Sequence, residues 1–165
     1  MKTTKENLRY RLYLRFACIL LLSLLCSALL FYRAEGAPAD AVGLFAFLPI
    51  PLALLAPLLS VPNSYLCTLS LVYGAYNGAL LAHSIRLVQT GSIGFFSFNA
   101  AFLLIAFSLM LYLLAAAKAC QFAFENPARD TALIFKRAFL KYSAETVLFT
   151  ALSVSVYYLW SKLPI

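Results

Sequence analysis

The stretch GAYNGALLAHSIRLV, residues 74–88, places an asparagine, a histidine and an arginine inside a long apolar segment. Asn77 could bind a polar ligand, and His83 could take up and release a proton near neutral pH. A proton relay needs further ionisable groups at the same depth, but the Asp and Glu residues lie in loops or near the ends of the apolar segments. We therefore expect Asn77 to hydrogen-bond to a neighbouring helix and His83 to lie near the water boundary. Arg86 should extend its guanidinium into water while its stem covers apolar surface.

Small residues in the same segment recur at every fourth position, as Gly74, Gly78 and Ala82. Residues at this spacing share one face of a helix, and small side chains there let two helices approach closely in lipid. The spacing predicts a helix-packing stripe, against another helix of this chain or of a partner. Polar residues of later segments are available as hydrogen-bond partners for Asn77: Asn99, Ser108, Thr150, Ser153 and Ser155.

The chain lacks the residue sets on which most catalytic and metal sites depend. It has a single histidine and no HExxH, P-loop or GxSxG motif. Its cysteines form no CxxC pair and no Cys/His cluster, so neither a zinc site nor a disulfide framework is indicated: Cys18, Cys26, Cys67 and Cys120. We therefore expect no metal, no cofactor and no enzymatic activity. A lipid-modifying enzyme would need a charged catalytic cluster, which the sequence does not offer.

The composition points to a membrane protein. Hydrophobic residues make up 64% of the 165 residues and charged residues 12%, against about 45–50% apolar and about 25% charged in a soluble domain. One soluble core could not bury so much apolar side chain, so we expect a single all-α integral membrane domain over residues 1–165. Five segments are long enough to cross about 30 Å of hydrocarbon, and they lie at residues 15–32, 41–60, 65–88, 95–117 and 144–160.

Basic residues gather on one side of these five segments. The net charge is +7, and with a cytoplasmic N-terminus ten of the 13 Lys and Arg residues fall in residues 1–15, 61–64 and 118–143. The positive-inside rule then predicts a multi-pass membrane protein with its N-terminus in the cytoplasm and its C-terminus outside. Basic residues beside apolar spans indicate anionic lipid rather than nucleic acid. The first span and the APA at residues 37–39 also resemble a cleaved signal peptide, but the length of the span favours an uncleaved signal anchor.

Prolines interrupt the second predicted span, at Pro49, Pro51 and Pro57. Each removes a backbone donor and clashes with the preceding turn, so we expect this helix to be kinked or broken near residue 49. Broken helices build binding sites in many transporters. A site lined by this segment together with Asn77, His83 and Asn99 would make the chain a subunit of a small-molecule transporter, which is the main alternative.

The loop before the last span contains a predicted amphipathic helix, residues 127–142. Asn126 is a suitable N-cap and Pro127 a suitable first helical residue. Apolar residues share one face of this helix, and basic residues lie away from it: Arg129, Lys136, Arg137 and Lys141. Such a helix lies in the plane of the interface, with its basic face toward anionic headgroups or an acidic partner.

Three stretches resemble the stage II sporulation protein M family, small polytopic membrane proteins of endospore-forming bacteria. They are the basic N-terminus that leads into the first span, YGAYNGALL at residues 73–81, and KRAFLKYSAETVLFTALSVSV at residues 136–156, about a third of the chain. The resemblance implies a non-enzymatic scaffold that organises cell-wall hydrolases during forespore engulfment through helix–helix contacts. The glycine stripe and the basic helix would then contact other membrane proteins, and the oligomeric state stays open.

Overall fold

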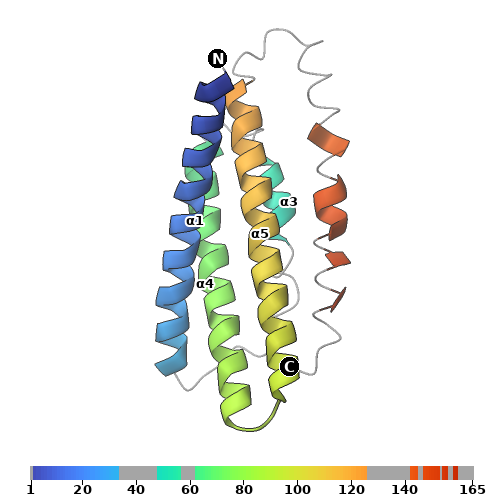
Figure 1. Cartoon of the computed structure of the whole chain (residues 1–165). Coiled ribbons are helices and arrows are strands. Elements are labelled where there is room, and N and C mark those ends of the chain that lie inside the picture. The colour runs from blue at the N-terminus through green and yellow to red at the C-terminus, as the bar shows by residue number, and fades with distance from the viewer. Residues whose placement is uncertain are drawn as a thin grey trace.

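The computed structural model describes residues 2–33, 48–56 and 62–125, together with short stretches at 142–144, 147–152, 154–155 and 158–159. These residues form α1 (Lys2–Arg33), α3 (Pro49–Leu54), α4 (Pro62–Gln89) and α5 (Phe95–Glu125). The short stretches that follow Lys141 are helical as well. Every regular element of the described part is a helix (Figure 1), so the all-α prediction is confirmed there.

Helices α1 and α5 are longer than the spans predicted for them. α1 has 32 residues and begins at Lys2 rather than near residue 15, which makes it about 48 Å long at 1.5 Å per residue. No glycine or proline interrupts it, and its Lys, Arg, Glu and Leu residues are good helix formers. α5 likewise continues past residue 117 to Glu125. The predicted spans end where charged residues begin. A helix can continue beyond that point because its backbone hydrogen bonds do not depend on apolar side chains.

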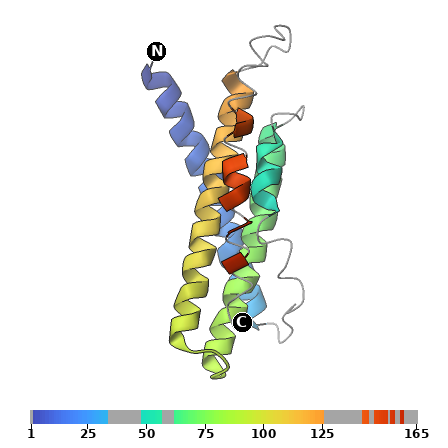
Figure 2. The same ribbon diagram turned by 90° about the vertical axis from the view of Figure 1, so that its right-hand side faces the viewer.

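Helix α4 closely matches the third predicted span. It begins at Pro62, a residue that suits the first helical position because its missing N–H is not needed there. At its other end the N–H of Gly91 donates to the carbonyl of Val88 at 3.0 Å, and that of Ser92 to the carbonyl of Leu87 at 2.8 Å. With Gly91 at φ 71°, this is a Schellman motif. The turn sends α5 back antiparallel to α4 (Figure 2).

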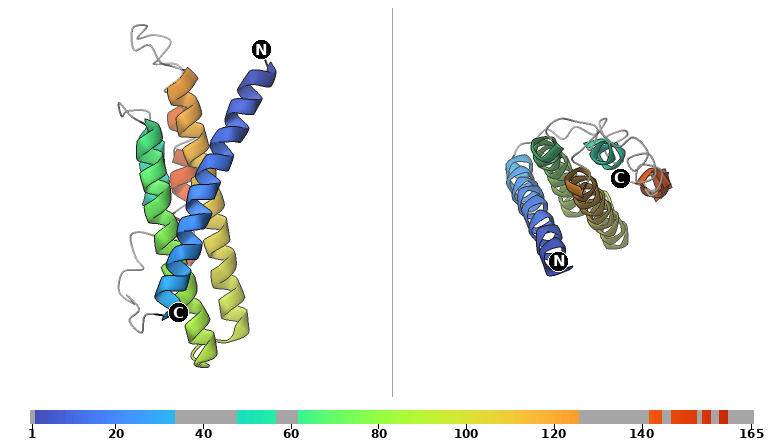
Figure 3. Two further views of the ribbon diagram at one scale, coloured as in Figure 1. Left: turned by 90° about the vertical axis from the view of Figure 1, so that its left-hand side faces the viewer. Right: turned by 90° about the horizontal axis from the view of Figure 1, so that it is seen from above.

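Helices α1 and α4 lie side by side and run in the same direction (Figures 1 and 3). Their hydrogen-bonded pairs rise together in residue number, from Ser23 with Leu71, through Ser27 with Ala75, to Tyr32 with Gln89. Because α1 ends at the opposite end of the bundle from the start of α4, residues 34–61 must return the chain between them. Helix α3 lies in this connection and contacts α5 and α4.

The main buried core lies in the half of the bundle nearer the start of α1. Fully buried side chains from four helices meet in it, among them Phe16 of α1, Ile50 of α3, Leu66 of α4 and Tyr112 of α5. The Tyr65 hydroxyl at the start of α4 donates to a carbonyl of α3 at 3.2 Å. The core therefore ties α3 to the three long helices.

Two helices of the described part are long and apolar enough to cross a membrane, by length and composition: Tyr10–Arg33 of α1 and Phe95–Ala123 of α5. Only 22% of the apolar window in α1 is buried, against 50% of that in α5. α4 is long enough, but residues such as Tyr73, Tyr76 and Asn77 make it more polar, and it does not meet the same criterion.

The prolines of the second predicted span begin a helix. Pro49 and Pro51 lie in the first turn of α3, which has six residues, and a missing backbone N–H costs little in a first turn. Pro57 lies outside the described residues. The structure describes residues 48–56 of the predicted span 41–60, so its full length is not covered.

The last two predicted segments lie mostly outside the described residues. Only short helical stretches of the span 144–160 are described, and of the predicted amphipathic helix 127–142 only Tyr142. The basic residues predicted to face the headgroups therefore lie outside the described part: Arg129, Lys136, Arg137 and Lys141. Tyr142 is buried, and its hydroxyl donates to the carbonyl of Leu54 in α3 at 2.5 Å.

Candidate functional site

Gly74 and Gly78 mark the points where α4 meets the backbone of α1. A Cβ atom on Gly74 would collide with the carbonyl oxygen of Leu20, and one on Gly78 with that of Leu24. Real Cβ atoms essentially never come closer than 3.0 Å to such an atom. The obstacles are backbone atoms rather than flexible side chains, so a larger residue fits only if the helices separate. Glycine is required here for close approach.

Two serines of α1 complete the contact. The hydroxyl of Ser23 donates to the carbonyl of Leu71 at 2.5 Å, and that of Ser27 donates to the carbonyl of Ala75 at 2.6 Å. The serines, their acceptors and the glycines all repeat after four residues, so the two helices meet with matching spacing. We call this contact the α1–α4 seam, formed by Ser23, Ser27, Gly74 and Gly78.

The predicted small-residue stripe thus packs within the chain. Gly74 and Gly78 face α1, and Ala82, one turn further along α4, is 1% exposed. The spacing alone left open whether the stripe meets this chain or a partner. Because α1 covers it, a partner protein cannot dock against these residues while the seam is closed.

Asn77 is buried, with 2% of its surface exposed, and within the described residues its side chain forms no direct hydrogen bond to the backbone of another helix. Its Nδ2 donates to the carbonyl of Tyr73, one turn earlier in α4, at 2.9 Å. The Tyr73 hydroxyl lies near the side chains of Asn77 and of Ser108 in α5. The predicted link to a neighbouring helix therefore runs through Tyr73, and Ser108 is its far end.

A second polar contact between α4 and α5 was missed by the sequence analysis. The hydroxyls of Ser70 and Tyr112 lie 2.9 Å apart, and the carbonyl oxygen of Leu66 lies 2.7 Å from the Ser70 hydroxyl and 3.2 Å from the Tyr112 hydroxyl, so that one hydroxyl donates to the other and the second donates to the carbonyl. The ring of Tyr112 also lies 5.0 Å from that of Tyr73, centroid to centroid. Polar atoms that are buried cost free energy unless they are hydrogen-bonded, and here the hydroxyls satisfy one another and the backbone.

Arg86 of α4 holds the end of α1, a contact that the sequence did not predict. Its Nη2 donates to the carbonyls of Phe31 and Tyr32, the latter at 2.6 Å. These carbonyls belong to the last turn of α1, where intrahelical donors are missing and the helix dipole favours a cation. Gln89 adds a hydrogen bond at 3.0 Å to the Tyr32 hydroxyl. We call this group the α1 end clamp: Arg86, Gln89 and Tyr32.

His83 and Asn99 do not join Asn77 in one site. His83 is half-buried on α4, and its ring makes no hydrogen bond to the described part of the chain. Asn99 is exposed, and its Nδ2 donates to the carbonyl of Phe95 in its own helix at 2.9 Å. At 1.5 Å per residue, Asn99 lies about 13 Å along α5 from Ser108, the residue linked to Asn77 through Tyr73.

Among the residues that the structure describes, no group of three or more His, Cys, Asp or Glu side chains could hold a metal ion. The four cysteines are free thiols, exposed at Cys18 and Cys26, half-buried at Cys67 and buried at Cys120. The side chains that the fold does bring together are those of the seam, the end clamp and the Tyr–Ser contacts, and all of them join helix to helix.

Comparison of the chain with protein-family models, with curated proteins and with solved structures finds no match.

Proposed function

We propose that the chain is a multi-pass membrane protein that organises other membrane proteins through helix–helix contacts, without a catalytic role. The observation that carries the membrane part is the length and apolar composition of Tyr10–Arg33 in α1 and Phe95–Ala123 in α5. The number of crossings that we propose rests on the parallel arrangement of α1 and α4. Two parallel spans both begin at the same face of a membrane, so the chain must cross back between them. The apolar residues 41–60 lie in the connection and are long enough for that crossing.

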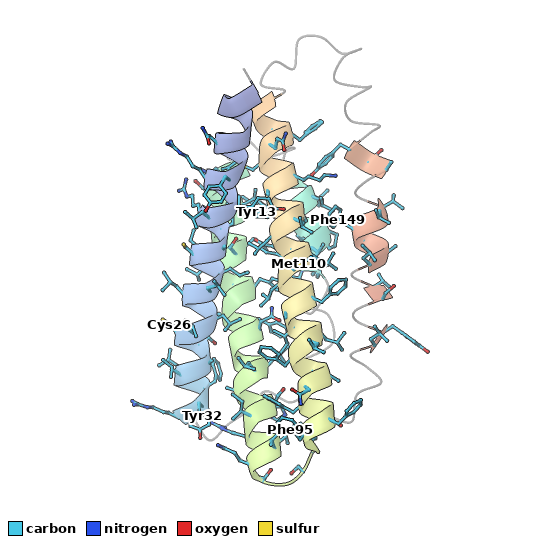
Figure 4. The ribbon with its side chains drawn as sticks, in the orientation of Figure 1. Tyr13, Cys26, Tyr32, Phe95, Met110 and Phe149 are labelled. Carbon is cyan, nitrogen blue, oxygen red and sulfur yellow. The ribbon has the colours of Figure 1, made fainter. Side chains whose placement is uncertain are left out.

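The outward faces of α1 and α5 support the same proposal. Large apolar side chains remain exposed on both helices, among them Leu29 (69%), Leu103 (66%) and Met110 (56%), the last labelled in Figure 4. Exposed apolar patches of this kind cause association in water. In a bilayer the same side chains face hydrocarbon or another membrane helix.

The residues after Tyr142 are consistent with a final crossing. Tyr142 stacks on Phe122 with centroids 4.6 Å apart, and further on Phe149 lies under Lys118, its ring centroid 5.8 Å from Nζ. From the first pair to the second, the residue number rises from Tyr142 to Phe149 in this segment and falls from Phe122 to Lys118 in α5. This segment therefore runs antiparallel to α5. Five crossings with a cytoplasmic N-terminus, as the charge pattern predicts, are the topology we propose.

The use of the buried polar groups favours a scaffold over a transporter subunit. Asn77, Ser70 and Tyr112 direct their hydrogen bonds to the helices themselves, and Asn99 faces outward. Because the α1–α4 seam is occupied inside the chain, we place the partner contacts on the outward face of α5 and on the amphipathic helix that the sequence predicts at residues 127–142. The resemblance of residues 73–81 and 136–156 to the stage II sporulation protein M family makes cell-wall hydrolases the partners to test first.

The test is crosslinking of the tagged full chain in its native membrane, followed by mass spectrometry of the captured proteins. We expect cell-wall hydrolases or their membrane adaptors to be captured by the wild-type chain and by a Gly94→Ala control, since Gly94 has no neighbour within 4 Å of an added Cβ. A Phe107→Ala/Met110→Ala variant, altered on the outward face of α5, should capture fewer. Capture of transporter ATPase and permease subunits alone, or of no other protein, would contradict the scaffold proposal.

A further inference from the structure

Two arginines stand one helical turn apart on α1. Arg11 and Arg15 are both exposed, and neither forms a hydrogen bond or ion pair with the residues that the structure describes. Leu12 and Phe16, the residues that follow the two arginines, are buried in the core and fix the rotation of the helix. The two guanidinium groups therefore lie together at the edge of the buried face, with Arg15 on the side of Cys120 in α5.

Below the arginines the same face continues as a row of exposed residues. The spacing of four and three residues places these positions on one stripe of α1: Cys18, Leu22 (63% exposed), Leu25 (57%) and Leu29 (69%). From Arg15 to Leu25 the helix rises about 15 Å, which is half of the roughly 30 Å hydrocarbon thickness of a bilayer. The stripe thus begins with two cationic side chains and continues as an apolar surface about as long as one leaflet is thick.

We propose that this face of α1 binds an anionic phospholipid, with the headgroup phosphate held between Arg11 and Arg15 and an acyl chain along Leu22 and Leu25. The proposal rests on the membrane placement proposed above. Guanidinium groups bind phosphate oxygens with two parallel hydrogen bonds. The apolar window of α1 begins at Tyr10, so Arg15 lies about 7 Å deeper, a depth that its long side chain can bridge by snorkelling.

A lipid fits this face better than a second copy of the chain. Copies inserted by the same charge rule are parallel, so a dimer along this stripe would bring two pairs of guanidinium groups together without a described counter-charge. Like charges in contact disfavour association. A phospholipid supplies the opposite charge to the arginines and hydrocarbon to the leucines at the same time.

The test uses the full chain in nanodiscs of equal phosphatidylglycerol and phosphatidylcholine, with retained lipids counted by native mass spectrometry after transfer to detergent. We expect the wild-type chain to retain phosphatidylglycerol preferentially. In the Arg11→Gln/Arg15→Gln variant retention should fall about tenfold, because each basic side chain near the surface contributes to headgroup binding. The Arg33→Gln/Lys162→Gln control removes the same charge elsewhere and should retain lipid as the wild type does. An Arg11→Lys/Arg15→Lys variant should retain an intermediate amount.

The outcomes separate this proposal from the membrane placement on which it rests. Failure of the wild-type chain to enter nanodiscs would overturn the placement itself. Entry without a preference for phosphatidylglycerol, or equal retention by the Arg11→Gln/Arg15→Gln variant, would overturn only the lipid site. Release of the lipid by millimolar inorganic phosphate at constant ionic strength would indicate a free-anion site instead. A dimer peak that disappears in the glutamine variant would assign the stripe to a second copy.

Discussion

The carbonyl oxygen of Leu20 in α1 occupies the place that a Cβ atom on Gly74 of α4 would take. Leu24 stands in the same relation to Gly78, one turn further along both helices. The serine hydroxyls of α1 bond to carbonyls of α4 beside these positions. The seam therefore determines how the parallel pair packs, and the proposed membrane topology depends on that pair.

Replacing either seam glycine should destabilise the protein. Gly74→Ala and Gly78→Ala each force the helices apart, and we expect each to lower the free energy of unfolding by about 1–3 kcal/mol, the usual cost of overpacking. The effect is measured as a lower melting temperature in detergent. Gly94→Ala is the matched control, because nothing lies within 4 Å of the added methyl group. Equal melting temperatures for Gly74→Ala and Gly94→Ala would show that the close approach does not exist.

The α1 end clamp should protect the last turn of α1 from solvent exchange. Arg86→Gln removes the cation at the Phe31 and Tyr32 carbonyls, and we expect faster hydrogen–deuterium exchange at the C-terminal end of α1. A capping contact of this kind contributes about 0.3–1 kcal/mol. Arg86→Lys should recover part of the protection, because an ammonium keeps the charge but not the fork of donors. Arg33→Gln, at an exposed arginine of the same turn, is the control, and exchange equal to that of this control would refute the clamp.

The hydroxyl of Tyr112 should contribute to stability, whereas exposed tyrosine hydroxyls should not. Tyr112→Phe removes the hydroxyl that shares hydrogen bonds with Ser70 and the Leu66 carbonyl, without changing the packing of the ring. The expected loss is about 0.5–1.5 kcal/mol of unfolding free energy. Tyr10→Phe, at a residue that is 70% exposed, should leave the melting temperature unchanged. If the two variants melt alike, the Ser70–Tyr112 contact has no stabilising role.

The all-α class and the ends of α4 could be predicted from the local sequence. Thr90 to Gly94 contain two glycines and a serine, which cannot continue a helix as well as leucine and alanine do, and α4 ends there. The four-residue spacing of Gly74 and Gly78 likewise identified a packing face. The spacing identifies the packing face of α4 but not the helix that packs against it. The sequence alone therefore could not distinguish α1 from a helix of a partner protein.

The roles of Arg86 and of the buried tyrosines depend on residues far away in the sequence. Arg86 binds carbonyls of Phe31 and Tyr32, which become neighbours only once α1 and α4 run parallel. Tyrosine is included in the hydrophobic fraction of the composition, yet Tyr73 and Tyr112 each carry a hydroxyl that needs a hydrogen-bond partner when it is buried. The serines at Ser70 and Ser108, which lie near these tyrosines on the facing helices, were the available signal.

The most direct test of the central claim asks on which side of the membrane the ends of α1 and α4 lie. The four native cysteines are changed to alanine, and single cysteines are introduced at exposed positions as Asn7→Cys, Arg33→Cys, Ser64→Cys or Thr90→Cys. Right-side-out membrane vesicles are then treated with a membrane-impermeant maleimide. Arg33→Cys and Thr90→Cys should react in closed vesicles, and Asn7→Cys and Ser64→Cys only after the vesicles are opened. Labelling of all four in closed vesicles, or of Arg33→Cys and Thr90→Cys from opposite sides, would contradict the parallel membrane-spanning pair.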